Sequence, residues 1–309
     1  MTIKSKKLSQ IAEQFSDEAA FLWLYRNNAL KSPIYNFDDL AEVEERLEAN
    51  LDGLNLSGED GWICCENSLS FEEPGEIFTA AVFAISMLDK KKLEKVFDVS
   101  GEDLALLNAL VDAFVWFPIA QVESMLEEMY ATQDLTRQYV ALSALVEHRK
   151  ASENLLTHAL KSEQEILVCR AIRAVAEQGM RNLNELVVPM KESDSKLIQF
   201  YACWATTRFG NADSLERLKS FVPHPMFGEQ ALQFVVMQKN TQDTINILRT
   251  YYHNEETQRI AVKGLGYLGN PRVIPMLIEI MLTDQLARIA GESFSLVTGV
   301  DLTLEKLEM

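Results

Sequence analysis

The sequence has few cysteines and no long apolar run. Its 309 residues include only four cysteines, none in C-x-x-C spacing: Cys64, Cys65, Cys169 and Cys203. Such cysteines are expected to be small buried side chains, and not disulfides or metal ligands. The longest nearly continuous apolar run, residues 78–88, is too short to span a membrane. No apolar segment of signal-peptide type follows the N-terminal lysines, so we expect a cytoplasmic protein with no membrane span.

Positive charge is also scarce. The chain has 29 Lys/Arg against 46 Asp/Glu, a net charge of -17. Residues 1–130 have 10 Lys/Arg against 25 Asp/Glu, whereas residues 131–309 have 19 against 21, so the excess acid is N-terminal. Neither region has the surplus of Lys/Arg that nucleic-acid phosphates require, so we expect no nucleic-acid partner. The acid either attracts a basic protein or keeps a helical surface solvated.

The motifs of zinc enzymes, serine hydrolases and nucleotide-binding proteins are missing. No H-E-x-x-H, G-x-S-x-G or P-loop pattern occurs. The closest two histidines are ten residues apart, and the four are His148, His158, His224 and His253. Histidines so spaced are expected to be structural or surface residues, so we predict no metal site.

Two local patterns resemble functional sites but lack the surrounding structure that such sites require. The glycines of GLGYLG, residues 264–269, look like a nucleotide loop but follow no predicted strand and lie in a helix of the repeat described below. Adjacent carboxylates, such as Glu72 with Glu73 or Glu127 with Glu128, cannot share one helix face. The four tryptophans are expected mainly in the core: Trp23, Trp62, Trp116 and Trp204. We therefore predict no catalytic, cofactor-binding or metal-binding residue, and no cofactor.

A repeat of about 30 residues runs through the second half of the chain. One alanine recurs at separations of 29 to 31 residues, at Ala141, Ala171, Ala202, Ala231, Ala261 and Ala290. A second position three residues later is mostly small, and the next is mostly apolar. This i, i+3, i+4 stripe predicts one helix in each repeat, in which small side chains allow close packing.

The repeat also predicts where these helices end. Eight residues after the alanine, three of the six repeats have a glycine, at Gly179, Gly210 and Gly269, as expected for a left-handed residue at a helix C-terminus. Asn270 and Pro271 then mark the start of a second helix. Stacked helix pairs are expected to leave an extended binding surface lined by the second helices. At the C-terminus, Thr298 and Gly299 indicate the end of an incomplete last repeat.

Residues 1–130 are also expected to be helical, but without the 30-residue period. Ser16 is a plausible N-cap for a helix that starts at Asp17. An amphipathic helix with an acidic outer face is predicted from the apolar stripe of Leu40, Val43, Leu47, Leu51 and Leu54. Residues 77–88 and 104–117 are apolar almost all round, which indicates helices packed inside a bundle.

Four segments resemble an uncharacterised bacterial HEAT-like repeat family that is often encoded beside type VI secretion genes. They are DEAAFLWLYRNNAL (17–30), LDGLNLSGEDGW (51–62), EPGEIFTAAVFAI (73–85) and LARIAGESFSLVTGVDL (286–302). The last, with its GESFSLVTGVDL C-terminus, is the most distinctive, and the resemblance covers nearly the whole chain. It implies a genomic setting but no activity and no catalytic residues.

The sequence therefore predicts an all-α protein with an acidic helical N-terminal domain at 1–130, an α-solenoid of about six short HEAT-like repeats at 131–302 and a C-terminal tail at 303–309. The predicted function is a non-enzymatic, protein-binding scaffold or adaptor. The resemblance implies a type VI secretion component or cargo as the partner. One alternative is an immunity protein that masks a toxin, and another is an enzyme of the bilin-lyase type, which shares short HEAT-like repeats.

Overall fold

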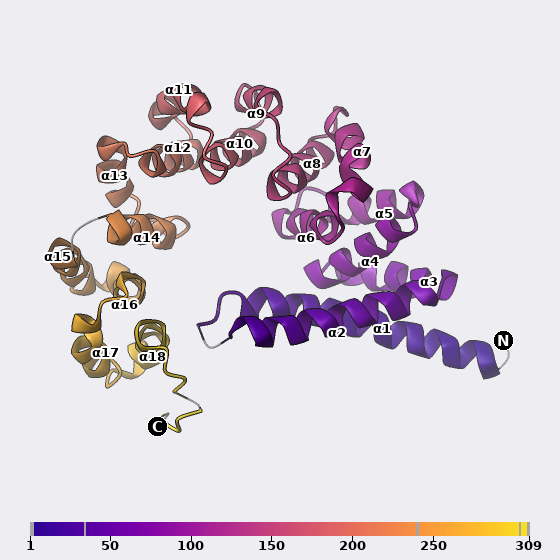
Figure 1. Ribbon diagram of the computed structural model, residues 1–309, viewed down its shortest axis with the longest axis horizontal. Helices are drawn as coiled ribbons and strands as arrows, with labels where there is room; N and C mark the ends of the chain where they lie inside the picture. The colour runs from indigo at the N-terminus through magenta and orange to yellow at the C-terminus, as the bar shows by residue number, and fades with distance from the viewer. Residues whose placement is uncertain (1–2, 34, 239–240, 303, 308–309) are drawn as a thin grey trace. The chain divides into compact units, whose positions relative to one another are not determined.

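The computed structural model describes residues 3–33, 35–238, 241–302 and 304–307, and Figure 1 shows that these form helices joined by turns. No β-strand occurs in these ranges, so the predicted all-α class is confirmed for the described chain. None of the helices in the same ranges is both long and apolar enough to cross a membrane.

The chain divides into two compact units. Unit 1 comprises Met1–Leu156 and Ser162–Arg170, and unit 2 comprises Thr157–Lys161 and Ala171–Met309. This division follows the packing of the chain. The predicted boundary at residue 130 marks the start of the sequence repeat instead, and it remains a prediction. In the predicted C-terminal tail, Thr303, Glu308 and Met309 lie outside the described residues.

Unit 1 is built around three alternate helices of the chain that pack in a row, with α4 against α6 and α6 against α8. The helix α1 packs against α2, α3 and α4. Its helices are α1 (Ile3–Ala29), α2 (Phe37–Leu56), α3 (Glu59–Ser68), α4 (Pro74–Ser86), α5 (Lys90–Ser100), α6 (Leu104–Val115), α7 (Ile119–Tyr130) and α8 (Leu135–Glu147), with a short 3-10 helix η1 (Leu69–Phe71) before α4.

The predicted helices of the N-terminal region are present. Asn36 caps α2 through a capping box with Asp39, and Val43, Leu47, Leu51 and Leu54 are buried as their spacing predicts. Nearly every residue of α4 is buried, and seven of the twelve residues of α6 are buried. The two apolar segments are therefore core helices.

The predicted helix start at Ser16 is wrong, because α1 begins at Ile3 and Ser16 lies inside it. The apolar stripe continues upstream of Ser16, with Ala12 buried one turn before it. The Ser16 side chain is itself buried and hydrogen-bonds the Cys65 thiol. A buried partner thus replaces the capping role that the local sequence suggested.

Unit 2 is also built of helices, and α9 (Glu153–Leu160) and α10 (Glu165–Glu177) each contribute residues to both units. In this unit α14 packs against α16, and α16 packs against α18 (Figure 1). The helices are α11 (Asn184–Val187), α12 (Lys196–Arg208), α13 (Ala212–Lys219), α14 (Gly228–Gln238), α15 (Thr241–Tyr252), α16 (Glu255–Leu268), α17 (Ile274–Ile280) and α18 (Asp284–Thr298), with 3-10 helices η2 (Arg181–Leu183), η3 (Val188–Glu192) and η4 (Pro271–Val273).

The repeated alanines occupy equivalent buried places. They lie on α8, α10, α12, α14, α16 and α18, and each is at most 1% exposed. Glycine serves the same purpose in α16, where a Cβ on Gly264 would meet Leu232 and Leu248, and a Cβ on Gly266 would lie 3.0 Å from the Ser293 Cα. Small side chains thus let α16 approach α14 and α18 closely, as predicted.

The predicted helix ends are also present. Gly179, Gly210 and Gly269 have φ values of 70°, 92° and 60°, which a side chain with a Cβ rarely adopts. Asn270 caps the following turn by accepting a hydrogen bond from the Arg272 N–H, although this turn begins as η4 and becomes helical only at Ile274. Gly299 ends α18 with φ 73°.

Candidate protein-binding groove

The four cysteines are all within the described chain and form no disulfide with one another. All are buried, as predicted. Burial raises the pKa of the Cys65 thiol to about 12 and that of Cys203 to about 11. These thiols are therefore protonated at neutral pH and are not nucleophiles.

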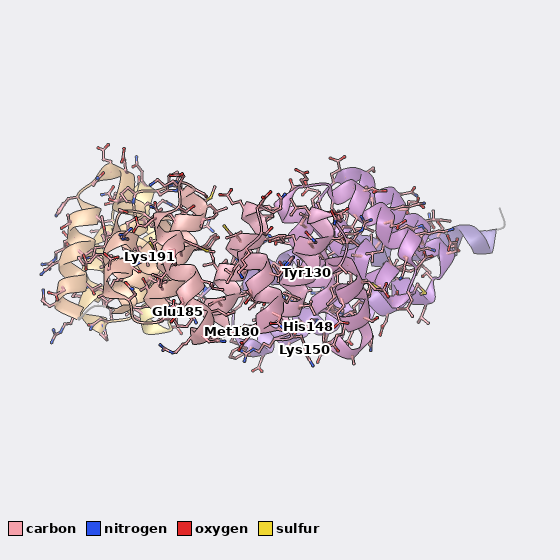
Figure 2. All side chains as sticks on the ribbon, turned by 90° about the horizontal axis from the view of Figure 1, so that it is seen from above. Tyr130, His148, Lys150, Met180, Glu185 and Lys191 are labelled. Carbon is pink, nitrogen blue, oxygen red and sulfur yellow. The ribbon has the colours of Figure 1, made fainter. Side chains whose placement is uncertain are left out.

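The histidines lie apart from one another in sequence and have separate partners. His148 ends α8, where its Nε2 lies 3.3 Å from the Phe114 carbonyl oxygen, and Figure 2 shows it beside Lys150 in unit 1. His224 stacks on Phe227 with ring centroids 4.5 Å apart. Among the described residues, no group of three or more His, Cys, Asp or Glu side chains could hold a metal ion.

The other sequence patterns are structural. The GLGYLG segment lies in α16 and its C-terminal cap, as predicted. Glu72 and Glu73 lie in the turn before α4, and Glu127 and Glu128 lie on α7.

Two of the tryptophans are core residues, because Trp23 and Trp62 are at most 5% exposed. Trp116 and Trp204 are only partly buried, so the expectation of core tryptophans holds for two of the four.

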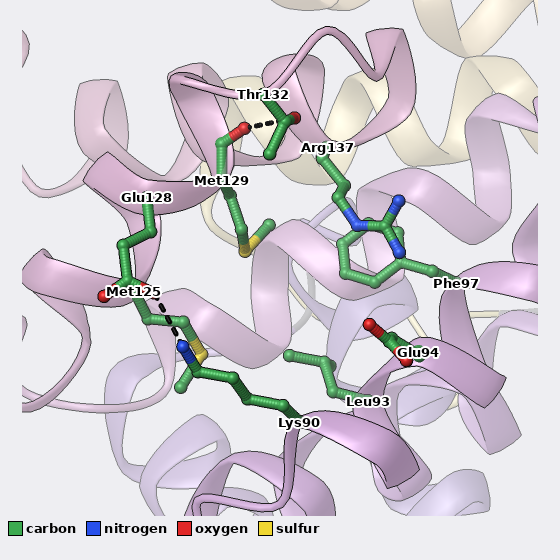
Figure 3. A pocket seen from close by; sticks show the side chains of 9 residues that line it. All are labelled: Lys90, Leu93, Glu94, Phe97, Met125, Glu128, Met129, Thr132 and Arg137. Atoms are coloured by element: carbon green, nitrogen blue, oxygen red, sulfur yellow. Dashed lines mark hydrogen bonds and ion pairs between the residues drawn. The ribbon is translucent and has the colours of Figure 1, made fainter.

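A groove in unit 1 combines an apolar floor with a charged rim. It lies between α5 and α7, with Arg137 from α8 at one end (Figure 3), and its volume is about 150 Å³. The side chains that line it are Lys90, Leu93, Glu94, Phe97, Met125, Glu128, Met129, Thr132 and Arg137. We call this feature the α5–α7 groove.

The floor of the α5–α7 groove comes from two pairs of apolar side chains, each pair spaced one helical turn apart. Leu93 and Phe97 extend from α5 and are buried, while Met125 and Met129 extend from α7. Residues at i and i+4 lie on one helix face, so both helices direct these side chains into the groove. Methionine is flexible and polarizable, which suits a surface that adapts to a bound side chain.

Charged side chains close the two ends of the groove. The Lys90 Nζ lies 2.7 Å from Glu128 Oε2, and both side chains are more than half exposed. At the other end, the Arg137 guanidinium carbon lies 5.3 Å from the centre of the Phe97 ring. An exposed ion pair contributes only about 0–1 kcal/mol, so a bound partner could displace Lys90 from Glu128 at small cost.

Two helix caps position these rim residues. Asp89 caps α5 and accepts hydrogen bonds from the Lys92 and Lys91 N–H groups, which lower the pKa of its carboxyl. Asp134 caps α8 and accepts from the Arg137 N–H at 3.0 Å. Burial would raise the Asp134 pKa, but hydrogen bonds from Arg137 and Thr136 and the guanidinium charge outweigh it and lower the pKa. Both caps are therefore ionised at neutral pH and fix the starts of α5 and α8.

The α5–α7 groove is not predicted from the sequence. Two local signals point to the helices that line it. One is the pair of aspartate caps, Asp89 and Asp134, and the other is the pairs of apolar residues at i and i+4 after Asp89 and before Asp134. These signals predict helices and their apolar faces, but the pairing of α5 with α7 across a gap depends on tertiary packing.

Comparison of the chain with protein-family models, with curated proteins and with solved structures finds no match in any of the three.

Proposed function

We propose that this chain is a non-enzymatic scaffold or adaptor that binds a protein partner. The proposal includes the arrangement of residues 131–302 as about six short HEAT-like repeats and a location in the cytoplasm. The observation that carries it is the α5–α7 groove, whose apolar floor and charged rim have the composition of a protein-binding hot spot.

The size of the groove favours a side chain over a small-molecule ligand. Its volume of about 150 Å³ is that of a cavity which holds a benzene-sized group. Pockets for drug-sized ligands or cofactors are usually about 300–1,000 Å³. A single leucine, methionine or phenylalanine of a partner therefore fits the groove, whereas a tetrapyrrole of the bilin type does not.

The charge of unit 1 favours a basic partner. Unit 1 has 14 Lys/Arg against 30 Asp/Glu, which leaves a net charge of -16 of the chain's -17. The electrostatic field of this negative charge speeds the approach of a positively charged protein and disfavours acidic proteins. The partner we propose presents one apolar side chain among basic residues.

The resemblance to the bacterial family encoded beside type VI secretion genes suggests a secretion component or cargo as that partner. This part of the proposal rests on the four resembling segments alone. Co-purification of the full chain from its native host tests it, because the proposal predicts a secretion component and an unrelated partner would contradict this part.

Binding at the groove is tested with short random peptides selected on the immobilised full-length chain. We expect the selected peptides to combine Lys/Arg with a large apolar residue. Met125→Trp fills the groove with a larger side chain. It should weaken the binding of the selected peptides about tenfold or more, because hot-spot contacts are concentrated in one pocket. Calorimetric titration of both proteins measures the affinity.

The matched control is Met226→Trp, which makes the same substitution at a 72% exposed residue of unit 2. It should leave the affinity unchanged. Thermal melts of both variants check that Met125→Trp is folded. Equal affinity of the two folded variants would exclude the groove as the binding site.

An immunity protein is the second candidate, favoured by the same net charge of -16 in unit 1. A basic toxin surface would be masked by an acidic unit with an apolar anchor site. Co-expression with a toxin encoded next to the chain should protect the cell, and charge-reversal of the toxin surface should remove the protection. Cells that die at the same rate with and without the chain would reject this candidate.

A further inference from the structure

An ion pair between Lys90 and Glu128 crosses the α5–α7 groove from one helix to the other. Lys90 is the first residue of α5, and its Nζ lies 2.7 Å from the Oε2 of Glu128 on α7. Figure 3 shows this pair as a dashed line beside Met125, which belongs to the floor of the groove. Because both charged side chains are more than half exposed, water screens their attraction and the pair separates readily.

The cation at the other end of the groove is held more firmly. Arg137 pairs with Asp134, with its Nη1 2.6 Å from Oδ2, and its guanidinium also lies over the Phe97 ring. The Arg137 side chain is 27% exposed, against 68% for Lys90. Of the two cations that line the groove, Lys90 is therefore the one that a partner can displace.

Glu94 offers Lys90 a second carboxylate. It lies on α5 four residues after Lys90, so the two side chains share a helix face, and charges at this spacing can form an ion pair. Glu94 is exposed and makes no ion pair within the described chain. When Lys90 leaves Glu128, its charge is therefore taken up one helical turn along α5.

The other charged side chains on α5 and α7 do not make the groove basic. Two lysines of α5 already pair with carboxylates of α3, in the pairs Lys92–Glu59 and Lys95–Glu66. The rest are one exposed lysine, Lys91, two exposed carboxylates, Asp98 and Glu127, and Glu123, which lies 3.9 Å from Lys150. With these charges counted, the surroundings of the groove are acidic and attract a cation of the partner.

We propose that Lys90 is an internal competitor of the protein partner, and that it occupies Glu128 until a Lys or Arg of the partner takes its place. Glu128 lies three residues after Met125 on the same face of α7. The partner segment therefore carries its basic residue about one helical turn from the apolar side chain that enters the groove. This inference rests on the proposed function, because it requires the groove to be the binding site.

The two halves of the ion pair should have opposite effects on binding. Lys90→Gln removes the competitor and should strengthen the binding of a basic peptide about two- to fivefold, the range of an exposed ion pair. Glu128→Gln removes the carboxylate and should weaken that binding by about the same factor. If the pair served only to hold α5 against α7, both substitutions would weaken binding.

The experiment uses a peptide that is selected on the immobilised full-length chain, contains Lys or Arg, and binds less tightly to Met125→Trp. Each of its basic residues is replaced by Gln in turn, and the replacement that costs the most affinity defines the neutral peptide. Calorimetric titration measures both peptides against the parent chain and the variants. Lys90→Gln should not strengthen the binding of the neutral peptide, and Glu128→Gln should not weaken it.

Lys91→Gln and Glu127→Gln are the matched controls. Each removes the same charge one position away, at an exposed residue that does not line the groove. Both should change the affinity of the basic peptide much less than Lys90→Gln and Glu128→Gln do. Thermal melts check that all four variants are folded.

Any of four results would overturn the role of Lys90. One is that Lys90→Gln leaves the affinity of the basic peptide unchanged or lowers it, and another is that it strengthens the neutral peptide equally. The third is that Glu127→Gln weakens binding as much as Glu128→Gln, which would indicate general charge attraction. The fourth is a selection that yields no peptide with Lys or Arg.

Failure of this inference is distinguishable from failure of the proposed function. Peptides that bind less tightly to Met125→Trp would keep the groove as the binding site under each of those four results. If Met125→Trp weakened no selected peptide, the proposed function would be rejected, and the role of Lys90 with it.

Discussion

Trp23 of α1 stacks on Phe78 of α4, with ring centroids 5.2 Å apart and an angle of 17° between the ring planes. On the other side of Phe78, Trp116 makes an edge-to-face contact at 5.7 Å. Phe78 is fully buried. This aromatic cluster joins the long first helix to the row formed by α4, α6 and α8, and so fixes α1 in unit 1.

Removal of the Trp23 indole should make unit 1 easier to unfold. We expect Trp23→Ala to lower the free energy of unfolding by about 3–5 kcal/mol, because it leaves a large cavity beside Phe78. Urea denaturation followed by circular dichroism measures this. Phe21→Ala is the control on the same helix, because Phe21 is 59% exposed, and it should change the free energy by about 0.5 kcal/mol or less. Equal losses in the two variants would contradict the anchoring role.

Two glycine substitutions separate close helix packing from helix propensity. A Cβ on Gly266 would lie 3.0 Å from the Ser293 backbone, whereas a Cβ on Gly291 meets only the end of the flexible Leu302 side chain at 3.2 Å. Gly266→Ala should therefore destabilise unit 2 by about 1–3 kcal/mol. Gly291→Ala should be neutral or stabilise it by up to about 1 kcal/mol, because alanine favours the helix. Thermal melts compare the variants, and a stabilising Gly266→Ala would show that α16 and α18 can separate freely.

The pH dependence of stability should include a contribution from Asp112. Burial raises the pKa of this carboxyl above its usual 3.8, and the nearby Glu147 adds to the shift, while hydrogen bonds with Asn27 and Trp23 and the charge of Arg26 oppose it. The folded chain thus binds this proton more tightly than the unfolded chain. The contribution to stability falls as the pH rises through the folded pKa, and it is recovered as the pH falls toward 3.8.

Asp112→Asn isolates that contribution, because the amide keeps an acceptor oxygen and has no charge. We expect the variant to have a higher melting temperature than the parent chain at pH 7. The difference should shrink as the pH falls below 3.8, where the parent carboxyl becomes protonated in both states. A difference that is independent of pH would mean that hydrogen bonding and not ionisation sets the effect.

Much of the fold follows from local sequence. The alanine period found the even-numbered helices from α8 to α18, one in each repeat, and the glycines at 179, 210 and 269 marked ends that require positive φ. The start of α1 was missed because Ser16 is a good cap in isolation, and only its burial against α3 shows that the helix continues.

The α5–α7 groove was not found from sequence for a related reason. It depends on a gap between two helices, which nothing local in the sequence predicts. The protein-binding function itself remains a proposal.

In the proposed function, an apolar side chain of the partner enters the α5–α7 groove. Methyl-labelled methionine NMR of the full chain tests it most directly, because Met125 and Met129 lie in the groove and Met226 lies in unit 2. During titration with a selected peptide, we expect the Met125 and Met129 methyl signals to shift and saturate together while Met226 stays unchanged. Saturated binding that leaves the Met125 and Met129 signals in place would contradict the claim.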